Sequence, residues 1–519
     1  MTHPEREYIV SLQEGVDYDQ FWQDMEHVCH NAPHVPVRCV QIVNERPGSL
    51  RSCHYALTDL EAAQLRQDAR VMCVELTLKD QPHIKLKTDA VQYADFTKTY
   101  SQSGSHINWG LRRCVNESNP YGTGTSVSGE FPYTLDGTGV DIVVTDSGIQ
   151  PDHPEFNDVH GESRVQLLDW YSASGLPGVQ SVNFYRDHDG HGTHVTGICA
   201  GKSYGWAKNA RIFSMKLNGL EGSGDAGTGI DVTEALDMIK MWHQQKPVNP
   251  TTGYARPTIV NMSWGVVLTF SNILGGSYRS TPWTGTAKRL DLGMVGNAFN
   301  EFSYRYTPID VDVSEMLAAG IIVCVSAGNY YQKADVVAGA DYDNYFTSSL
   351  YGDIYYHRGG TPHATGVIRV GSMDAQVRDA TTEYKSVFSD AGPLVDVWAP
   401  GSAIQSACSN INAFSATSYY DDPAYKQTNL SGTSMAAPQV AGACALYTQL
   451  NPWATPSQVK AWLISQSQPT IYTTGSDTDY TNNRSLLGSE SRVMFQPFNS
   501  EQPLTSQGNI SWSAIQLPV

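Results

Sequence analysis

The sequence has no long run of lysine and arginine, and its 34 basic residues are outnumbered by 52 acidic ones, for a net charge of -18. Binding of nucleic acid through a basic surface is therefore not expected. No segment approaches eighteen uncharged apolar residues, so no membrane-spanning helix is predicted. The first residues also lack a basic stretch followed by an apolar one. This argues against a secretory signal and predicts a cytoplasmic location at synthesis.

Closely spaced cysteine pairs are absent as well. The nine cysteines are scattered along the chain without a Cys-x-x-Cys spacing. Two of them, Cys199 and Cys324, lie inside apolar runs. An odd, scattered set predicts free, buried thiols in a reducing compartment rather than a disulfide framework.

The first part of the chain, residues 1–78, has a pattern of its own. Strands are predicted at 8–12, 37–43, 52–57 and 71–76, and helices at 18–29 and 58–67. Thr58 and Glu61 form a capping box at the start of the second helix. The order β-α-β-β-α-β predicts a small ferredoxin-like α+β domain.

The remainder of the chain changes character twice. Residues 79–106 are mostly polar and are predicted to form a linker. From 107 to 466, short apolar strands alternate with amphipathic helices, which predicts an α/β domain with a doubly wound, mostly parallel sheet. Residues 267–306 and 330–362 are rich in Gly, Tyr, Ser and Asp and are predicted to be surface insertions. The polar segment 467–519 is assigned as a C-terminal extension without a role.

Three motifs place reactive side chains at strand ends and helix starts. Asp146 ends an apolar strand, His191 stands in an Asp-Gly-His-Gly-Thr-His motif, and Ser434 stands in a Gly-Thr-Ser-Met-Ala-Ala-Pro motif. A serine hydroxyl becomes nucleophilic when an imidazole takes its proton. A buried carboxylate orients that imidazole and stabilises its protonated form. The carboxyl edge of a parallel sheet is also where ligand sites gather in α/β folds.

A fourth motif, Ala327-Gly328-Asn329, follows an apolar strand. The amide of Asn329 can donate to an oxyanion together with the backbone N–H of Ser434. The helix that begins at Ser434 adds further N–H groups and a favourable dipole.

Two other site classes compete for these residues. His188, His191 and His194 recur at helical spacing and could form a zinc cluster, but the His-Glu-x-x-His pattern is absent. An α/β-hydrolase would need a second glycine after Ser434 and the chain order Ser, Asp, His, and this sequence has neither.

The four motifs, in this order, resemble those of the subtilase family over residues 108–465. The segment 200–207 is most similar to the proteinase K branch. The resemblance implies a serine endopeptidase with Asp146, His191 and Ser434 as its triad and Asn329 as oxyanion donor. It makes His191 the base and gives His194 a structural role, with protein or peptide substrates and no cofactor in the chemistry.

Residues 1–78 resemble the inhibitory prodomains of subtilases, which assist folding, block the cleft with their C-terminal tail and are cleaved off. The resemblance therefore implies that the chain is a proenzyme inhibited by its own N-terminal domain. The alternative is a subtilase fold that acts as a catalytically inactive binding or structural module. Missing catalytic residues would favour that reading, and none is missing here.

The resemblance also implies where a peptide substrate lies. Subtilases hold an extended peptide between two strands by main-chain hydrogen bonds. The matching residues are Gly222, Ser223 and Gly224 on one side, Ser263, Trp264 and Gly265 on the other, and Gly328. Trp264 stands where the family usually has Leu or Met, and Val266 where it usually has Gly. Both changes are expected to add bulk next to the primary pocket, so broad specificity is not inferred.

The segment around Asp396 resembles one whose aspartate binds a cation in this family. The resemblance adds the main-chain carbonyls of Thr365 and Val367, and hard oxygen ligands suit Ca²⁺. A structural Ca²⁺ is one reading of this segment. The other is that Asp396 only closes a turn. The calcium loop that follows the histidine motif in the subtilisin branch is missing.

Overall fold

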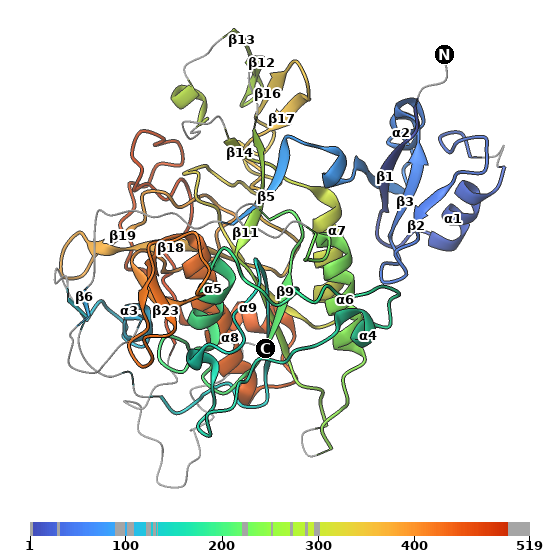
Figure 1. Ribbon diagram of the computed structural model, residues 1–519. Coiled ribbons are helices and arrows are strands. Elements are labelled where there is room, and N and C mark those ends of the chain that lie inside the picture. Colours follow the sequence, from blue (N-terminus) through green and yellow to red (C-terminus); the bar gives the residue numbers. More distant parts are fainter. Residues whose placement is uncertain are drawn as a thin grey trace.

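The computed structural model describes most of the chain (Figure 1). The described residues are 4–28, 32–88, 99–100, 108–120, 126–127, 131, 133–220, 227–250, 253–269, 273–285, 289–294 and 301–496.

The N-terminal unit is a four-stranded antiparallel sheet with two helices. Its elements are β1 (Arg6–Leu12), α1 (Tyr18–Glu26), β2 (Ile42–Asn44), β3 (Ser52–Leu57), α2 (Asp59–Leu65) and β4 (Val71–Leu76). The strand order β2-β3-β1-β4 is that of the ferredoxin-like fold. The capping box of α2 forms as predicted, with Thr58 accepting from the N–H of Glu61. The predicted order is confirmed, although α1 and β2 are shorter than expected.

The central sheet of the larger unit has seven strands in the order β19-β18-β15-β10-β8-β9, with β20 also paired to β18. They are β8 (Asp141–Asp146), β9 (Arg211–Lys216), β10 (Thr258–Met262), β15 (Ile322–Ser326), β18 (Ile368–Val377), β19 (Glu383–Lys385) and β20 (Val397–Pro400). Every pair is parallel except β18 with β19. The predicted doubly wound, mostly parallel sheet is confirmed.

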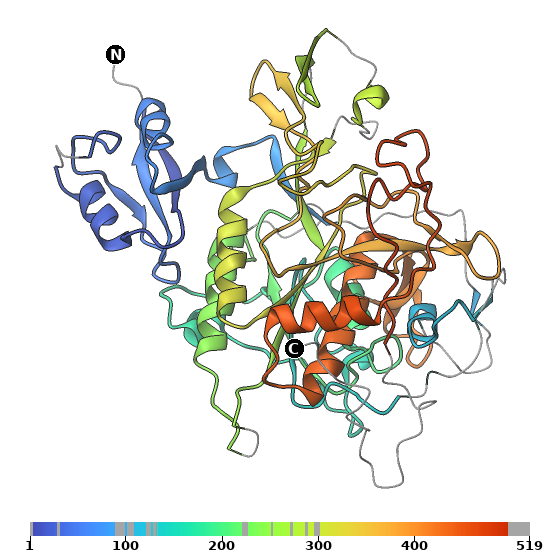
Figure 2. The same ribbon diagram turned by 180° about the vertical axis from the view of Figure 1, so that it is seen from behind.

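Helices cover both faces of this sheet (Figures 1 and 2). They are α3 (Trp109–Cys114), α4 (Trp170–Ser174), α5 (His191–Ala200), α6 (Val232–Gln244), α7 (Thr307–Ala318), α8 (Thr433–Leu450) and α9 (Pro456–Gln466). α5 packs against α8, and α6 packs against α7. Within β8, Ile142 and Val144 enter the core on the α5/α8 side, while Val143 enters the core on the α6/α7 side. Burial on both faces explains the continuous apolar runs of these strands.

The two predicted insertions contribute to one small antiparallel sheet, in the order β13-β12-β16-β17, at the top of Figure 1. Its strands are β12 (Ile273–Tyr278), β13 (Thr281–Thr284), β16 (Tyr345–Ser348) and β17 (Gly352–Tyr355). The remaining short elements are β6 (Thr99–Tyr100), β7 (Ser126–Val127), β21 (Ile404–Cys408), β22 (Thr417–Ser418), β23 (Lys426–Leu430) and the 3-10 turns at Leu78–Asp80, Pro154–Phe156 and Arg289–Leu292.

Two predicted boundaries differ from the structure. Part of the predicted linker is a strand, β5 (Ile84–Thr88), in a three-stranded sheet with β11 (Trp264–Thr269) and β14 (Glu301–Ser303). The predicted C-terminal extension continues the core of the larger unit up to Gln496, because Leu487, Val493 and Met494 are buried in the same cluster as α8. Both segments are polar on average, and their few buried apolar residues form no pattern that predicts a strand or a core segment.

The eight described cysteines are all free thiols, and six of them are buried. This agrees with the expectation of buried thiols. No helix in the described ranges is both long and apolar enough to cross a membrane.

Candidate active site

Asp146 and His191 form a buried pair at the carboxyl edge of the central sheet. Asp146 is the last residue of β8, and His191 is the first residue of α5. Nδ1 of His191 lies 2.8 Å from Oδ1 and 3.0 Å from Oδ2 of Asp146. A Cβ atom on Gly192 would lie 2.1 Å from the carbonyl oxygen of Gly148, so only glycine lets α5 start this close to β8.

The electrostatics of the pair favour a histidine that can take up a proton. Burial lowers the pKa of His191, but the charge and hydrogen bond of Asp146 outweigh it and raise this pKa above its usual value. His194 differs, since its Nε2 donates towards the carbonyl oxygens of Ile404 and Thr428 at 3.1 and 3.2 Å. Burial lowers the pKa of His194 to about 3, so it stays neutral. The geometry therefore supports the structural role expected for His194.

A further carboxylate, Asp187, was not singled out by sequence reasoning. It accepts from the Ser147 hydroxyl at 2.9 Å, from the Gly190 N–H at 2.8 Å, and from the N–H and hydroxyl of Thr193 at 2.9 and 2.6 Å. These bonds tie the turn after β8 to the start of α5. The only feature of the sequence that could have pointed to Asp187 is its place four residues before His191.

Ser434 is the second residue of α8 and is fully buried. Its hydroxyl donates to the carbonyl oxygen of Ser263 at 3.0 Å, and the Ser263 hydroxyl donates back to the carbonyl oxygen of Ser434 at 3.0 Å. Within the described residues, Nε2 of His191 makes no hydrogen bond. The serine and histidine are thus not bonded to each other in this state, as is frequent in the absence of substrate.

Asn329 is held next to the start of α8 by Thr433, the residue before Ser434. Its Oδ1 accepts from the N–H and the hydroxyl of Thr433, both at 2.9 Å. Because these two donors define the oxygen, the donor end of the amide is Nδ2. Gly328 precedes it with φ of +114°, and a Cβ there would lie 2.3 Å from a carboxylate oxygen of Asp390. Gly328 is therefore a backbone requirement of the strand end that carries Asn329.

The predicted substrate strands are only partly described. Gly222, Ser223 and Gly224 lie outside the described residues. On the other side, Ser263 leads into β11, which pairs antiparallel with β5 so that Trp264 faces Thr88 and Gly265 faces Lys87. β5 also meets Leu220 through a parallel bridge at Leu86.

The expectation that Trp264 and Val266 add bulk to the primary pocket is not supported by their positions. Both side chains are buried in the α6/α7 core, and the indole N–H of Trp264 donates to the Thr145 hydroxyl at 2.9 Å. β11 therefore presents backbone rather than these side chains to β5.

Two of the three predicted calcium ligands, Asp396 and Val367, contact a lysine instead. Nζ of Lys460, on α9, lies 2.8 Å from Oδ1 of Asp396 and 2.8 Å from the carbonyl oxygen of Val367. Oδ2 of Asp396 accepts from the N–H of Arg369 at 2.9 Å, and Thr365 is exposed. The ammonium group occupies one carboxylate oxygen of Asp396 and the carbonyl of Val367, so these two ligands do not fit a calcium ion as they stand.

The zinc alternative finds no support in the geometry. His191 and His194 turn their ring nitrogens to different partners, Asp146 and the backbone. Across the described parts of the chain, no group of three or more His, Cys, Asp or Glu side chains could hold a metal ion.

Comparison with known proteins places the chain in a family. Residues 137–490 match the subtilase family model, Peptidase_S8. An extracellular serine proteinase of Thermus sp. (strain Rt41A) is 29% identical over 82% of this chain and 72% of its own length. Proteinase R of Parengyodontium album is 27% identical over 65% of this chain and 59% of its own.

Among solved structures, fervidolysin from Fervidobacterium pennivorans, a keratinolytic enzyme related to subtilisin, matches with a TM-score of 0.53 and 17% identity. The match covers 98% of this chain and 62% of that one, and at this identity it supports the fold alone. The family match spans more than half of the chain and includes all four motifs. The chain therefore belongs to the subtilase family and is a serine endopeptidase.

Proposed function

We propose that this endopeptidase cleaves peptide bonds through an Asp146–His191–Ser434 triad and an acyl-enzyme, and that residues 1–88 hold it as a latent proenzyme. The observation that carries the catalytic part is the buried Asp146–His191 pair at the start of α5, the helix that packs against α8, where Ser434 stands. The carboxylate fixes Nδ1–H of the imidazole, so Nε2 is the nitrogen that can accept a proton.

The chemical steps follow from these roles. His191 Nε2 takes the proton of the Ser434 hydroxyl as its oxygen bonds to the substrate carbonyl carbon. Asn329 Nδ2 and the N–H of Ser434 donate to the oxyanion. The C–N bond then breaks, and the imidazolium gives its proton to the leaving amine. Water, deprotonated by the same imidazole, hydrolyses the ester and restores the serine.

The latent state is supported by the position of β5. This strand lies between Leu220 and β11, where an extended substrate would add to the sheet edge. β5 ends at Thr88, opposite Trp264, which is one residue from Ser263. Because the carbonyl of Ser263 accepts from the Ser434 hydroxyl, the chain leaves β5 close to the nucleophile. We therefore place self-cleavage shortly after Thr88.

The docking of the N-terminal unit supports the same proposal. Arg46, in the turn between β2 and β3, inserts its buried guanidinium between α6 and α7. It lies 2.8 Å from Asp237 of α6 and 2.9 Å from Asp312 of α7. A Cβ on Gly48 would lie 2.6 Å from the Asp237 side chain, so the turn needs a glycine to approach this closely.

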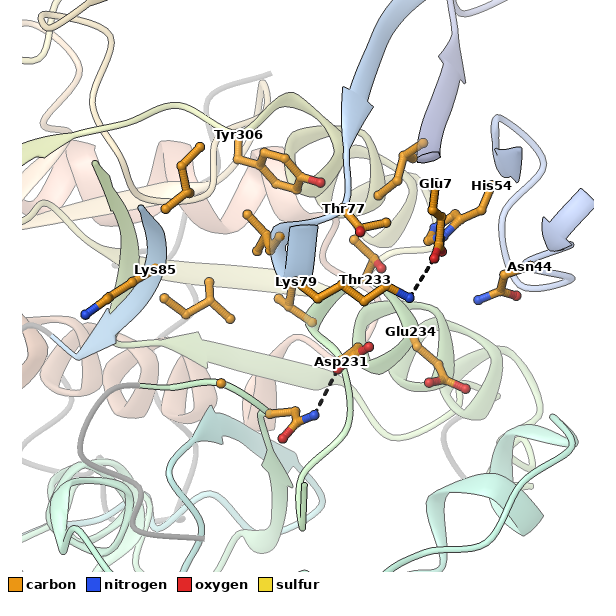
Figure 3. Close-up of a pocket in the computed structure, with 17 residues that line it drawn as sticks. Glu7, Asn44, His54, Thr77, Lys79, Lys85, Asp231, Thr233, Glu234 and Tyr306 are labelled. Carbon is orange, nitrogen blue, oxygen red and sulfur yellow. Dashed lines mark hydrogen bonds and ion pairs between the residues drawn. The ribbon is translucent and has the colours of Figure 1, made fainter. Parts of the chain in front are cut away.

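The same interface also contains a cavity of about 270 Å³, lined by residues from both units (Figure 3). Charged side chains line part of it, namely Glu7 and Lys79 of the N-terminal part and Asp231 and Glu234 of the catalytic part, and apolar residues such as Leu86 line the rest. Permanent interfaces are usually more apolar and more tightly packed. An incompletely filled contact that contains charged groups suits a domain that has to separate after cleavage.

Full-length wild-type protein and its Ser434→Ala variant test the proposal together. Wild type should react with a fluorophosphonate probe, digest casein and yield a chain that starts shortly after residue 88. The variant should stay full length, resist the probe and lose several powers of ten in turnover. A variant that digests casein as fast as wild type would remove the triad assignment. A wild type that does not react with the probe would favour the alternative of an inactive binding module. A wild type that stays full length yet is fully active would show that the prodomain assignment is wrong.

A further inference from the structure

The strand in the cleft carries a lysine that meets a carboxylate of the catalytic domain. Nζ of Lys87 lies 2.9 Å from Oε2 of Glu301, the first residue of β14. The glutamate side chain is only 12% exposed and that of the lysine 30%. The pair therefore lies partly out of water, where its attraction is less screened than on an open surface.

The register of the sheet explains why these two side chains meet. On one side of β11, Lys87 of β5 stands opposite Gly265. On its other side, Glu301 of β14 stands opposite Thr269. Gly265 and Thr269 are four residues apart, so all these positions fall on one face of the sheet. Gly265 contributes no side chain opposite Lys87, and the long lysine stem can reach across β11 to β14.

An aromatic ring adds a second contact for the cation. Nζ of Lys87 lies 5.9 Å from the centroid of the Tyr330 ring, within the range of a cation–π interaction. Tyr330 directly follows Asn329, so this wall is part of the active-site strand end. Glu301 and Tyr330 thus belong to the catalytic domain and remain in place when β5 leaves.

We propose that Glu301 and Tyr330 form a subsite that selects a basic side chain at the substrate position opposite Gly265. The inference rests on the proposed function, because it treats β5 as a stand-in for the substrate strand. It names a substrate class: extended peptides with lysine or arginine at that position, two residues before the one that would face Ser263.

Peptides copied from the strand test this subsite with the self-processed, active enzyme. The series is Ile-Lys-Leu-Xaa-Thr-Asp-Ala-Val, the sequence of residues 84–91, with lysine, norleucine or glutamate at Xaa. Wild type should cleave the lysine peptide with a kcat/KM about two- to fivefold above that of the norleucine peptide, and the glutamate peptide more slowly still. Mass spectrometry of the products checks that all three are cut at the same bond.

Two variants assign the preference to Glu301. Glu301→Gln, nearly the same shape, should bring the lysine-to-norleucine ratio of kcat/KM close to one. Glu301→Lys should favour the glutamate peptide. Glu162→Gln, a matched change at an exposed site in another loop, should keep the wild-type ratio. Equal wild-type rates on lysine and norleucine peptides, or a preference that survives Glu301→Gln, would overturn the subsite and leave the protease intact. A wild type that cleaves none of the peptides or casein would instead overturn the proposed function, and the subsite with it.

Discussion

Asp146 and Asp396 are both carboxylates beside parallel strands of the central sheet, and each is paired with a basic side chain. Asp146 binds His191, which comes from the helix that starts beside its own strand end. Asp396 binds Lys460, which comes from α9, far along the chain. The histidine keeps a second ring nitrogen that can exchange a proton. The lysine has one ammonium group, which bridges Asp396 and Val367 and serves to hold them together.

A third site, at the docked N-terminal unit, resembles the second. Arg46 also reaches its carboxylates, Asp237 and Asp312, from a distant part of the chain. The three sites differ in what the cation can do. An imidazole titrates near neutral pH, whereas an ammonium or a guanidinium stays charged and acts as a fixed link. The predictions below separate a reactive pair from two fixed ones.

The largest effect is expected for Asp146→Asn, which should lower turnover by about 10⁴-fold because the imidazole loses its orienting carboxylate. The acidic limb of the pH profile of kcat/KM should also move. Asp146 raises the pKa of His191, and the base must be neutral to act, so the wild-type limb lies above the usual histidine pKa. Without that charge, the residual activity should persist to lower pH. An acidic limb that does not shift would mean that Asp146 does not set the pKa of the base.

Asn329→Ala should come next, with turnover lower by about 100- to 1000-fold and little change in KM, since its donor bond forms mainly in the transition state. The variant also removes the acceptor of the Thr433 N–H, so its melting temperature should be measured beside its kinetics. A large rise in KM at unchanged turnover would contradict the role of an oxyanion donor.

These two sites show which parts of the structure the sequence could predict. Asp146, His191, Ser434 and Asn329 stand in short motifs whose neighbours supply the local geometry, such as Gly192 and Gly328. The alternating apolar strands likewise predicted the parallel sheet, because burial on both faces leaves a strong pattern.

The features that the sequence analysis did not predict also share a cause. Lys460 follows Asp396 by a whole helix and more, and no local pattern links the two. β5 lies in a polar stretch, since a strand that adds to a cleft edge needs only alternate residues such as Leu86 to be buried. The expectation for Trp264 came from the family resemblance, whereas its side chain packs in the core against α6 and α7, which lie elsewhere in the chain. All three features, the Lys460 contact, the strand β5 and the burial of Trp264, depend on contacts between distant segments, which a single sequence does not show.

Arg46→Met should weaken the latent state. It leaves Asp237 and Asp312 without their guanidinium in a buried interface, and removing one partner of such a site costs about 3–5 kcal/mol. Purified variant should therefore contain less full-length chain and show more activity towards casein than wild type at equal age. Arg70→Met is the matched control, because Arg70 pairs with Asp24 and Asp68 inside the N-terminal unit. If the Arg46 and Arg70 variants show the same fraction of full-length chain and the same activity towards casein, Arg46 does not hold the N-terminal unit in place.

The smallest effect concerns Lys460 and separates a fixed ammonium from a calcium ion. If the ammonium fills the site, chelator should leave the melting temperature of wild type unchanged. Lys460→Met leaves the Asp396 carboxylate and the Val367 carbonyl without their cation, and should lower the melting temperature by about 2–4 °C. Added Ca²⁺ should then restore part of the loss in this variant alone, because an ion bound only to the native state stabilises it by mass action. Lys202→Met, which breaks an exposed pair with Asp421, should show neither the loss nor the calcium response. A wild type destabilised by chelator would instead support the calcium expected from the resemblance, with Lys460 displaced whenever the ion binds.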